Sequence, residues 1–315
     1  MQITSSPLPQ VHLHLFGAAT PAGTALMELV LTKPRAWLLF GYSRNPSKQE
    51  VLMHRADFHD PESFYPQGDP SFCECAVWIS FGPIWLLAPF LEQLAVNHPE
   101  RLRGIRGLIA CSSSSVITKR FAANKFDRQL RANLYAAEHQ MISTCRRLQI
   151  PLRILRPTLI YGQVGPYGDR NLSRLLVQLR RLPLLPLPAE TGLRQPIHAS
   201  QLAAVTFQLA KQLITDGWDP NLPECIGVGG DSELSYTAMI RALQRSLPQD
   251  DQARCCRLLP VPNRLFFLFA AFLLLLSPKA FEAVLRMGAD LSGFTPAHQL
   301  LDEPPQPFPI QPVTR

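Results

Sequence analysis

The chain has 315 residues, of which 46% are hydrophobic and 17% are charged. This balance is too apolar for a disordered chain, and the length suffices for one large domain or two smaller ones. It also excludes collagen-like, coiled-coil and disulfide-scaffold proteins. The net charge of +7 favours an acidic partner, such as a nucleotide, a phosphate, a nucleic acid or an anionic lipid.

The seven cysteines form no Cys-x-x-Cys pair, and their odd number is typical of reduced thiols in a cytosolic protein. Neither Cys73/Cys75 nor Cys255/Cys256 has a histidine or a second cysteine pair at zinc spacing, so the sequence predicts no metal site. The amino terminus lacks the basic start and apolar run of a signal peptide. We therefore expect a cytoplasmic protein.

Short apolar runs alternate with helical patterns over the first two-thirds of the chain, which is typical of a parallel α/β sheet. In chain order, the expected strands are Val11–Phe16, Trp37–Tyr42, a run within Val51–Phe58 that ends at Asp57, Cys75–Phe81, Arg106–Cys111 and Leu152–Leu155. Helices are expected over residues 23–33, 83–96 and 125–148. This alternation predicts a Rossmann-type, doubly wound parallel sheet with a smaller carboxyl-terminal lobe.

After Asn171 the sequence has few long strand-like runs. We expect a Rossmann-type domain over residues 8–170 and a smaller, mostly helical lobe over 171–300, interleaved with the sheet near 192–230. The lobe opens with RLLVQLRRLPLLPLP, which predicts a helix followed by a proline-broken loop. Residues 301–315 are rich in proline and are expected to form an extended tail.

A glycine turn, GAATPAG, follows the first expected strand at residues 17–23. A strand, a glycine turn and a helix amino terminus together offer N–H donors and a favourable dipole to a pyrophosphate. Gly17 suits the tight turn and Gly23 suits close packing of helix on strand, but Thr20 stands where another glycine usually lets the cofactor approach. The turn predicts a dinucleotide site with a weakened fingerprint, and an ordinary β-α turn is the alternative.

The end of the second expected strand indicates which dinucleotide binds. A cofactor without a 2′-phosphate usually meets an aspartate or glutamate there, and this chain has none. Ser43 and Arg44 suit a 2′-phosphate, with Lys48 a few residues on, so NADP is favoured over NAD. The alternative is that Arg44 is a solvated loop cation.

Six ordered motifs resemble the extended short-chain dehydrogenase/reductases, specifically the NAD-dependent epimerase/dehydratase family that acts on nucleotide sugars. They are GAATPAG (17–23), SRNP (43–46), ADF (56–58), CSSSS (111–115), LRPTLIYG (155–162) and GLRQPIH (192–198). The resemblance implies that NADP or NAD and a nucleotide-sugar-like small molecule bind. The cofactor residues that it implies are Gly17, Ala18, Thr20, Pro21, Ala22, Gly23, Ser43, Arg44, Asp57, Phe58, Ser80, Phe81, Gly82 and Pro157.

The resemblance also implies a catalytic serine and a Tyr-x-x-x-Lys pair on one helix face. Ser113 and Ser114 are the candidates for the hydroxyl. If Glu138 is the glutamate that follows the family's tyrosine by eight residues, the tyrosine and lysine positions are Leu130 and Leu134. Leucine cannot transfer a proton, so the usual mechanism is absent in this register.

Tyr135 is a substitute acid, with His139 four residues on, but only in a register shifted by one residue, about 100° around the helix. The alternative, which is favoured, is a half-buried Tyr135 and a surface His139. Asn171 and Arg194 are the residues expected to bind the nucleotide sugar, with Arg194 against its pyrophosphate. A solvated loop cation is the alternative for Arg194.

One uninterrupted apolar run, Leu265–Leu276, challenges a purely soluble interpretation. At about 1.5 Å per residue it reaches about 18 Å, which is short of the roughly 30 Å hydrocarbon core of a membrane. A buried helix is favoured over an in-plane membrane contact, because the run has no polar face. Residues 119–194 carry a net charge of +10, which favours a phosphorylated ligand and would equally suit an anionic membrane.

The leading hypothesis is a protein that binds a dinucleotide and a nucleotide sugar, with altered or reduced catalysis, and an NAD(P)-dependent enzyme is the favoured class. The alternative is a catalytically inactive scaffold or assembly factor that docks to a membrane or a membrane-bound partner. Nucleic-acid binding is not expected, since the sequence has no helix-turn-helix signal, zinc module or basic strand with interleaved aromatics. We expect a cytoplasmic location, with membrane association as the alternative.

Overall fold

The computed structural model describes residues 11–32, 37–44, 53–65, 75–122, 124–215 and 218–311. Residues 8–10 of the expected first domain, Lys48, and residues 312–315 of the expected tail lie outside this part. The chain divides into two compact units, which are described separately below. Unit 1 comprises Met1–Ser112, Ala136–Leu155 and Ala203–Ile226, and unit 2 comprises Ser113–Tyr135, Arg156–Leu202 and Gly227–Arg315. The units therefore do not follow a single cut at residue 170.

One eight-stranded sheet has the order β16-β13-β6-β5-β4-β1-β2-β3. Its strands are β1 (Val11–Phe16), β2 (Trp37–Ser43), β3 (Met53–Arg55), β4 (Ala76–Ser80), β5 (Ile105–Cys111), β6 (Leu152–Pro157), β13 (Cys225–Gly229) and β16 (Thr295–Pro296). The pairs β1–β2, β1–β4, β2–β3, β4–β5, β5–β6 and β13–β16 are all parallel. The order β3-β2-β1-β4-β5-β6 is that of a doubly wound dinucleotide-binding sheet, which confirms the predicted fold class.

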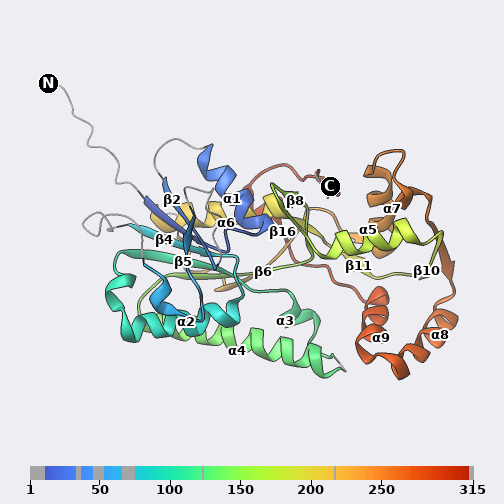
Figure 1. The fold of residues 1–315 in the computed structure, drawn as a ribbon, viewed down its shortest axis with the longest axis horizontal. Helices are drawn as coiled ribbons and strands as arrows, with labels where there is room; N and C mark the ends of the chain where they lie inside the picture. Colours follow the sequence, from blue (N-terminus) through green and yellow to red (C-terminus); the bar gives the residue numbers. More distant parts are fainter. Residues whose placement is uncertain are drawn as a thin grey trace. The chain divides into compact units, whose positions relative to one another are not determined.

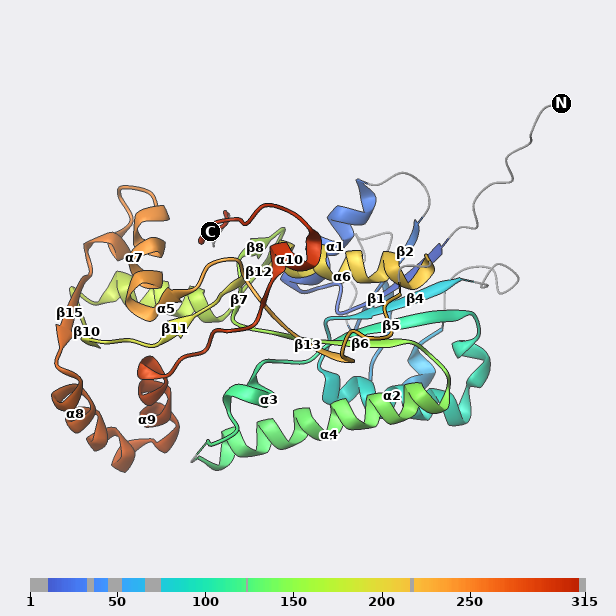
Figure 2. The same ribbon diagram turned by 180° about the vertical axis from the view of Figure 1, so that it is seen from behind.

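In unit 1, helices cover both faces of the sheet (Figures 1 and 2). α1 (Pro21–Leu31) and the unit 1 part of α6 (Ala199–Ile214) lie on one face, while α2 (Ile84–Asn97) and the second half of α4 (Lys125–Arg147) lie on the other. The strands β1 and β4 are buried along their whole length, as strands covered on both faces must be. The switch in strand order between β1 and β4 leaves a crevice position at their carboxyl ends.

Two sequence expectations about strands were wrong. The third strand ends at Arg55 and not at Asp57, because Asp57 starts a turn in which its carbonyl accepts the N–H of Asp60 at 2.9 Å. The expected proline-broken loop is a strand, β10 (Leu184–Pro188), which pairs in parallel with β15 (Arg257–Val261). A two-stranded ribbon has only edge strands, where proline is tolerated.

Unit 2 has its own core between α5 (Asn171–Arg181), α7 (Tyr236–Ser246) and the β10–β15 ribbon. Helical spacing puts the apolar residues of α5 and α7 on one face each. The buried side chains are Leu172, Leu175, Leu176, Leu179, Leu187, Met239, Ile240 and Leu243. Shorter elements complete the unit: α3 (Ser115–Thr118), β7 (Ile160–Tyr161), β8 (Gln163–Val164), β9 (Tyr167–Gly168), β11 (Leu193–Arg194), β12 (Ile197–His198), β14 (Leu234–Ser235) and α10 (Ala297–Leu301).

The carboxyl-terminal half of unit 2 contains a helical hairpin of α8 (Asn263–Leu276) and α9 (Pro278–Leu285), beside β10 and β15 in both ribbon views (Figures 1 and 2). The described part of the expected tail follows α10. It binds unit 2 through backbone N–H groups, which donate from Gln306 to the Asp231 carboxylate at 2.9 Å and from Phe308 to Ser232 Oγ at 3.0 Å. The tail is thus held along unit 2.

Candidate dinucleotide and ligand sites

The glycine turn between β1 and α1 closes tightly enough to require both of its glycines. Gly17 has φ +76°, a left-handed conformation that favours glycine. A Cβ at Gly17 would lie 2.9 Å from the backbone nitrogen of Gly82, and a Cβ at Gly23 would lie 2.3 Å from the carbonyl oxygen of Gly17. The two glycines therefore have the roles that the sequence predicted, in the turn and in helix packing.

Thr20 does not project into the space in front of α1. Its hydroxyl donates to the Gly17 carbonyl at 2.7 Å and accepts the Gly23 N–H at 3.1 Å, as the amino-terminal cap of α1. Pro21 stands at the first helical position, where no N–H is needed. Thr20 therefore caps the helix end at the position where a glycine usually stands, and its hydroxyl bonds the Gly23 N–H.

The carboxyl ends of β4 and β5 add polar groups to unit 1. Ser80 is buried, and its hydroxyl accepts the Gly82 N–H at 3.2 Å. Phe81 donates its N–H to the Phe16 carbonyl at 2.9 Å, which ties the β4 end to the β1 end. The Ser112 hydroxyl is buried and has no hydrogen-bond partner among the described residues. An unpaired buried hydroxyl at this edge is consistent with a polar ligand.

Asp57 and Phe58 come directly after β3 and have different surroundings. The Asp57 carboxylate accepts the N–H of His59 at 3.0 Å, so one oxygen caps the turn. The Phe58 ring packs against Phe16 and Phe90, with ring centres 5.6 and 5.0 Å apart, and is half-buried. Phe58 therefore packs with other aromatic side chains of unit 1.

Two arginines lie at the neighbouring ends of β2 and β3, and the sequence analysis named only one of them. Ser43 and Arg55 are direct partners in the parallel β2–β3 register, and Arg44 follows Ser43. Arg44 and Arg55 are both exposed, and neither forms an ion pair within the described residues. Sequence reasoning missed Arg55 because its strand was expected to end two residues later, at Asp57. A register alignment of the two strands would have found it.

The catalytic candidates Ser113 and Ser114 lie in unit 2 with Pro157. The Ser114 N–H donates to the Pro157 carbonyl at 3.0 Å, and the Ser113 hydroxyl accepts the N–H of Ser115 at 3.1 Å. The serine run and the β6 end are thus adjacent.

The burial of side chains on α4 distinguishes the two registers in which its proton-transfer residue could lie, at position 130 or at Tyr135. Leu134 and Glu138 are 2% and 1% exposed, whereas Tyr135 is 47% exposed and His139 lies on the same solvent side. Arg131 stacks over the Tyr135 ring at 5.7 Å. The inward face of α4 is therefore the one that carries leucine at both family positions.

Arg194 is buried, so the interpretation of a solvated loop cation was wrong. Its guanidinium donates to the carbonyls of Leu193 and Ala289, each at 2.7 Å, and to that of Arg286, and it lies over the Tyr236 ring at 5.2 Å. Burial lowers the pKa of Arg194 from its ordinary value. Asn171 is exposed at the start of α5. Their roles in binding a nucleotide sugar remain predictions.

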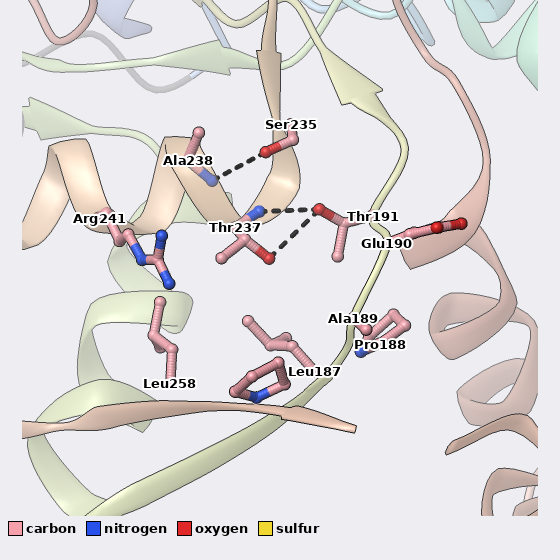
Figure 3. Close-up of a pocket in the computed structure, with 11 residues that line it drawn as sticks. Leu187, Pro188, Ala189, Glu190, Thr191, Ser235, Thr237, Ala238, Arg241 and Leu258 are labelled. Carbon is pink, nitrogen blue, oxygen red and sulfur yellow. Dashed lines mark hydrogen bonds between the residues drawn. The ribbon is translucent and has the colours of Figure 1, made fainter. Parts of the chain in front are cut away.

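A pocket of about 390 Å³ lies in unit 2 between α7 and the β10–β15 ribbon (Figure 3). Its apolar wall includes Leu187 and Leu258, and Arg241 enters from α7. Thr191 and Thr237 hydrogen-bond through their hydroxyls at 3.2 Å. Arg241 forms no ion pair with any described residue. The sequence analysis missed this pocket, because its lining comes from segments about 70 residues apart.

Comparison with solved structures identifies the fold. UDP-glucuronic acid 4-epimerase from Bacillus cereus, in complex with NAD, matches with a TM-score of 0.61 and 15% identity, covering 94% of this chain and 92% of that one. A nucleoside-diphosphate-sugar epimerase from Staphylococcus aureus matches with a TM-score of 0.58 and 15% identity, covering 94% and 98%. This chain has the fold of nucleotide-sugar epimerases.

The epimerase fold also includes dTDP-glucose 4,6-dehydratase from Bacillus anthracis, in complex with NAD, at a TM-score of 0.53 and 13% identity, over 81% of this chain and 86% of that one. Comparisons with protein-family models and with curated proteins find no match. Identities at this level show the epimerase fold and leave the ligand and the reaction to the residues.

Proposed function

We propose that unit 1 binds a nicotinamide dinucleotide at the Gly17–Gly23 turn, and that the protein is a divergent member of the NAD-dependent epimerase/dehydratase family. The turn carries the proposal. It combines a left-handed glycine with a helix amino terminus, which is the arrangement that a pyrophosphate needs, and the Thr20 hydroxyl caps that helix end. Structures of proteins with the same fold contain NAD.

NADP is the preferred dinucleotide. Arg44 and Arg55 extend from adjacent strand ends beside Ser43, and a 2′-phosphate placed there would meet two guanidinium groups and a hydroxyl. Residues 41–44, at the end of β2, include no aspartate or glutamate that would repel the phosphate or bind a free ribose hydroxyl.

A nucleotide sugar is the proposed second ligand, with exposed Asn171 and the Arg241 pocket as the polar features of unit 2 that favour it. The guanidinium of Arg194 is already bonded to three backbone carbonyls. A bound nicotinamide would accept and return a hydride. Leu130 and Leu134 cannot move the accompanying proton, so the proposal includes altered or reduced catalysis, with Ser113 and Ser114 as the remaining hydroxyl candidates.

Calorimetric titration of the full chain with NADPH and with NADH tests the dinucleotide proposal. We expect NADPH to bind more tightly, and Arg44→Ala with Arg55→Ala to weaken NADPH binding about a hundredfold while leaving NADH unchanged, since each of the two charge-assisted hydrogen bonds contributes about 1.5 kcal/mol. Arg103→Ala, an exposed arginine at the amino end of β5, is the matched control.

Absence of binding of either dinucleotide at millimolar concentration would contradict the proposal. Equal loss of NADPH and NADH affinity in the double variant would leave dinucleotide binding in place and remove the NADP preference. The same titration with UDP-glucuronic acid added to the NADPH-saturated protein tests the second ligand.

A non-catalytic scaffold is the second candidate function. The apolar exposed face of α8 favours it, because an enzyme that acts only on soluble ligands has no need of such a face. Dinucleotide binding without turnover, together with membrane binding, would distinguish this function from the first.

A further inference from the structure

Helix α8 presents a row of large apolar side chains to solvent. Leu265, Leu268, Phe269 and Phe272 are 47%, 62%, 67% and 66% exposed. The interpretation of this run as a buried helix was therefore wrong for these four residues. Their spacing of three and four places them along one side of the helix, and we call them the α8 stripe.

Two residues beside the stripe are packed, so a docked helix presents it. Ala270 is 8% exposed, and the Phe267 ring lies 3.2 Å from where a Cβ at Gly288 would stand. Sequence reasoning failed here because an apolar run shows that a helix avoids water, but not how much of its surface other elements cover.

The hairpin is also anchored through α9 and the turn after it. The Glu282 carboxylate accepts the N–H of Asn124 at 3.0 Å, and the Asp127 carboxylate pairs with Lys119 at 2.5 Å and with Arg286. These contacts hold the stripe in place before any partner arrives, which lowers the entropic cost of docking.

The charged residues near the α8 stripe indicate the kind of partner that it binds. Residues 254–288 contain five basic side chains and one acid, which gives a net charge of +4. The acid is Glu282, which is buried and bonded to Asn124. Arg257 and Arg264, by contrast, are exposed. One exposed acid, Glu190, lies at the start of α8, where its N–H donates to Asn263 Oδ1 at 3.1 Å, so the exposed arginines outnumber it beside the stripe. An apolar face with this excess of cations is complementary to an anionic lipid surface.

We propose that the α8 stripe inserts in the plane of the interface of an anionic membrane. Among the described residues, no helix is long and apolar enough to cross a membrane. The stripe offers leucine and phenylalanine without a hydrogen-bonding group, which suits acyl chains better than the polar rim of a protein interface. This inference does not depend on dinucleotide binding.

Flotation of the full chain with lipid vesicles tests the proposal. We expect binding to vesicles that contain phosphatidylglycerol and weak binding to phosphatidylcholine alone. Replacing Leu268, Phe269 and Phe272 together by glutamine should reduce the bound fraction at least about tenfold, since each side chain loses its apolar insertion. The control replaces Leu31, Val96 and Ile117 by glutamine, because these are 63%, 67% and 50% exposed and lie outside α8.

Substitution of the arginines near the stripe tests whether charge contributes to binding, as it should for an anionic lipid. Arg257→Gln with Arg264→Gln should weaken binding to phosphatidylglycerol vesicles severalfold and reduce its salt dependence, whereas Arg241→Gln with Arg245→Gln should not. Phe269→Trp gives a fluorescence signal that should shift to the blue and be quenched by brominated lipid.

Unchanged vesicle binding in the triple α8 variant would overturn the proposal. So would a concentration-dependent dimer that the same variant converts to a monomer in sedimentation, because a second copy would then cover the stripe. Thermal unfolding of the variant should match that of the parent protein, since the three side chains are exposed.

Discussion

At the scale of single residues, His14 is the most perturbed histidine of unit 1. It is 1% exposed, its ring stacks on Phe40 with centres 5.3 Å apart, and its Nδ1 lies 3.0 Å from the Tyr42 hydroxyl. Burial lowers the pKa of His14 to about 3, with smaller effects from the nearby His12 and His54. The folded protein therefore holds this imidazole neutral where the unfolded chain, with a pKa of about 6.5, would protonate it.

The pKa difference predicts a loss of stability in acid. As the pH falls below about 6.5, His14 binds a proton in the unfolded state but stays neutral in the folded state. The free energy of unfolding therefore decreases by about 1.4 kcal/mol per pH unit until the pKa of the folded state is reached. Urea unfolding at pH 7 and pH 5 should show a decrease of about 2 kcal/mol that His14→Gln largely abolishes. The exposed His59→Gln is the control, and an equally steep decrease in His14→Gln would contradict the assignment.

At the scale of elements, α4 shows why the catalytic pair cannot simply be restored. Leu134 and Glu138 lie on its buried face, while Tyr135 lies on its exposed face with Arg131 over the ring. A leucine that fills the core is part of the packing. A lysine at that position would have to carry its charge into the same space.

We therefore expect Leu134→Lys to lower the free energy of unfolding by about 3 kcal/mol and Tyr135→Phe to change it by less than about 0.5 kcal/mol. Urea unfolding measures both. Turnover of NADPH with a nucleotide sugar, where it occurs, should be the same in Tyr135→Phe as in the parent protein. Loss of turnover in that variant would instead assign the shifted register.

At the scale of the whole molecule, unit 2 joins segments that are far apart in the chain. Asp127 and Arg286 are 159 residues apart, and Asn124 and Glu282 are 158 apart, yet each pair is in direct contact. Burial alone would raise the pKa of Asp127, but Lys119, Asn124 and Arg286 hold it below its ordinary value. This charge cluster fastens the α8–α9 hairpin.

Substitution of Asp127 should weaken the attachment of the α8–α9 hairpin to the rest of unit 2. Asp127→Ala leaves Lys119 without its carboxylate and leaves Arg286 with only that of Glu282, at 3.6 Å, so we expect the free energy of unfolding to fall by about 3 kcal/mol. Asp251→Ala breaks the more exposed pair with Arg180 and should cost less than about 1 kcal/mol. Equal losses in the two variants, measured by urea unfolding, would show that burial of the first pair has no special effect.

Patterns within a few residues were enough to predict the sheet, its doubly wound class and the two glycines of the turn. The assignment of Leu130 and Leu134 to the proton-transfer positions rests on the resemblance and stays a prediction. Strand and helix periodicity, glycine conformation and residue identity are local properties, so they can be read along the chain. The same reasoning missed β10 as a strand, since its pairing depends on β15 about 70 residues away.

Only the tertiary structure decided which of these groups water reaches. It turned the Thr20 hydroxyl into the loop, set Arg55 beside Ser43, buried Arg194 among carbonyls and left the α8 stripe uncovered. Sequence determines how apolar or charged a segment is. Whether that segment is buried depends on distant elements that pack against it, and for α8 no described element covers Leu268, Phe269 and Phe272.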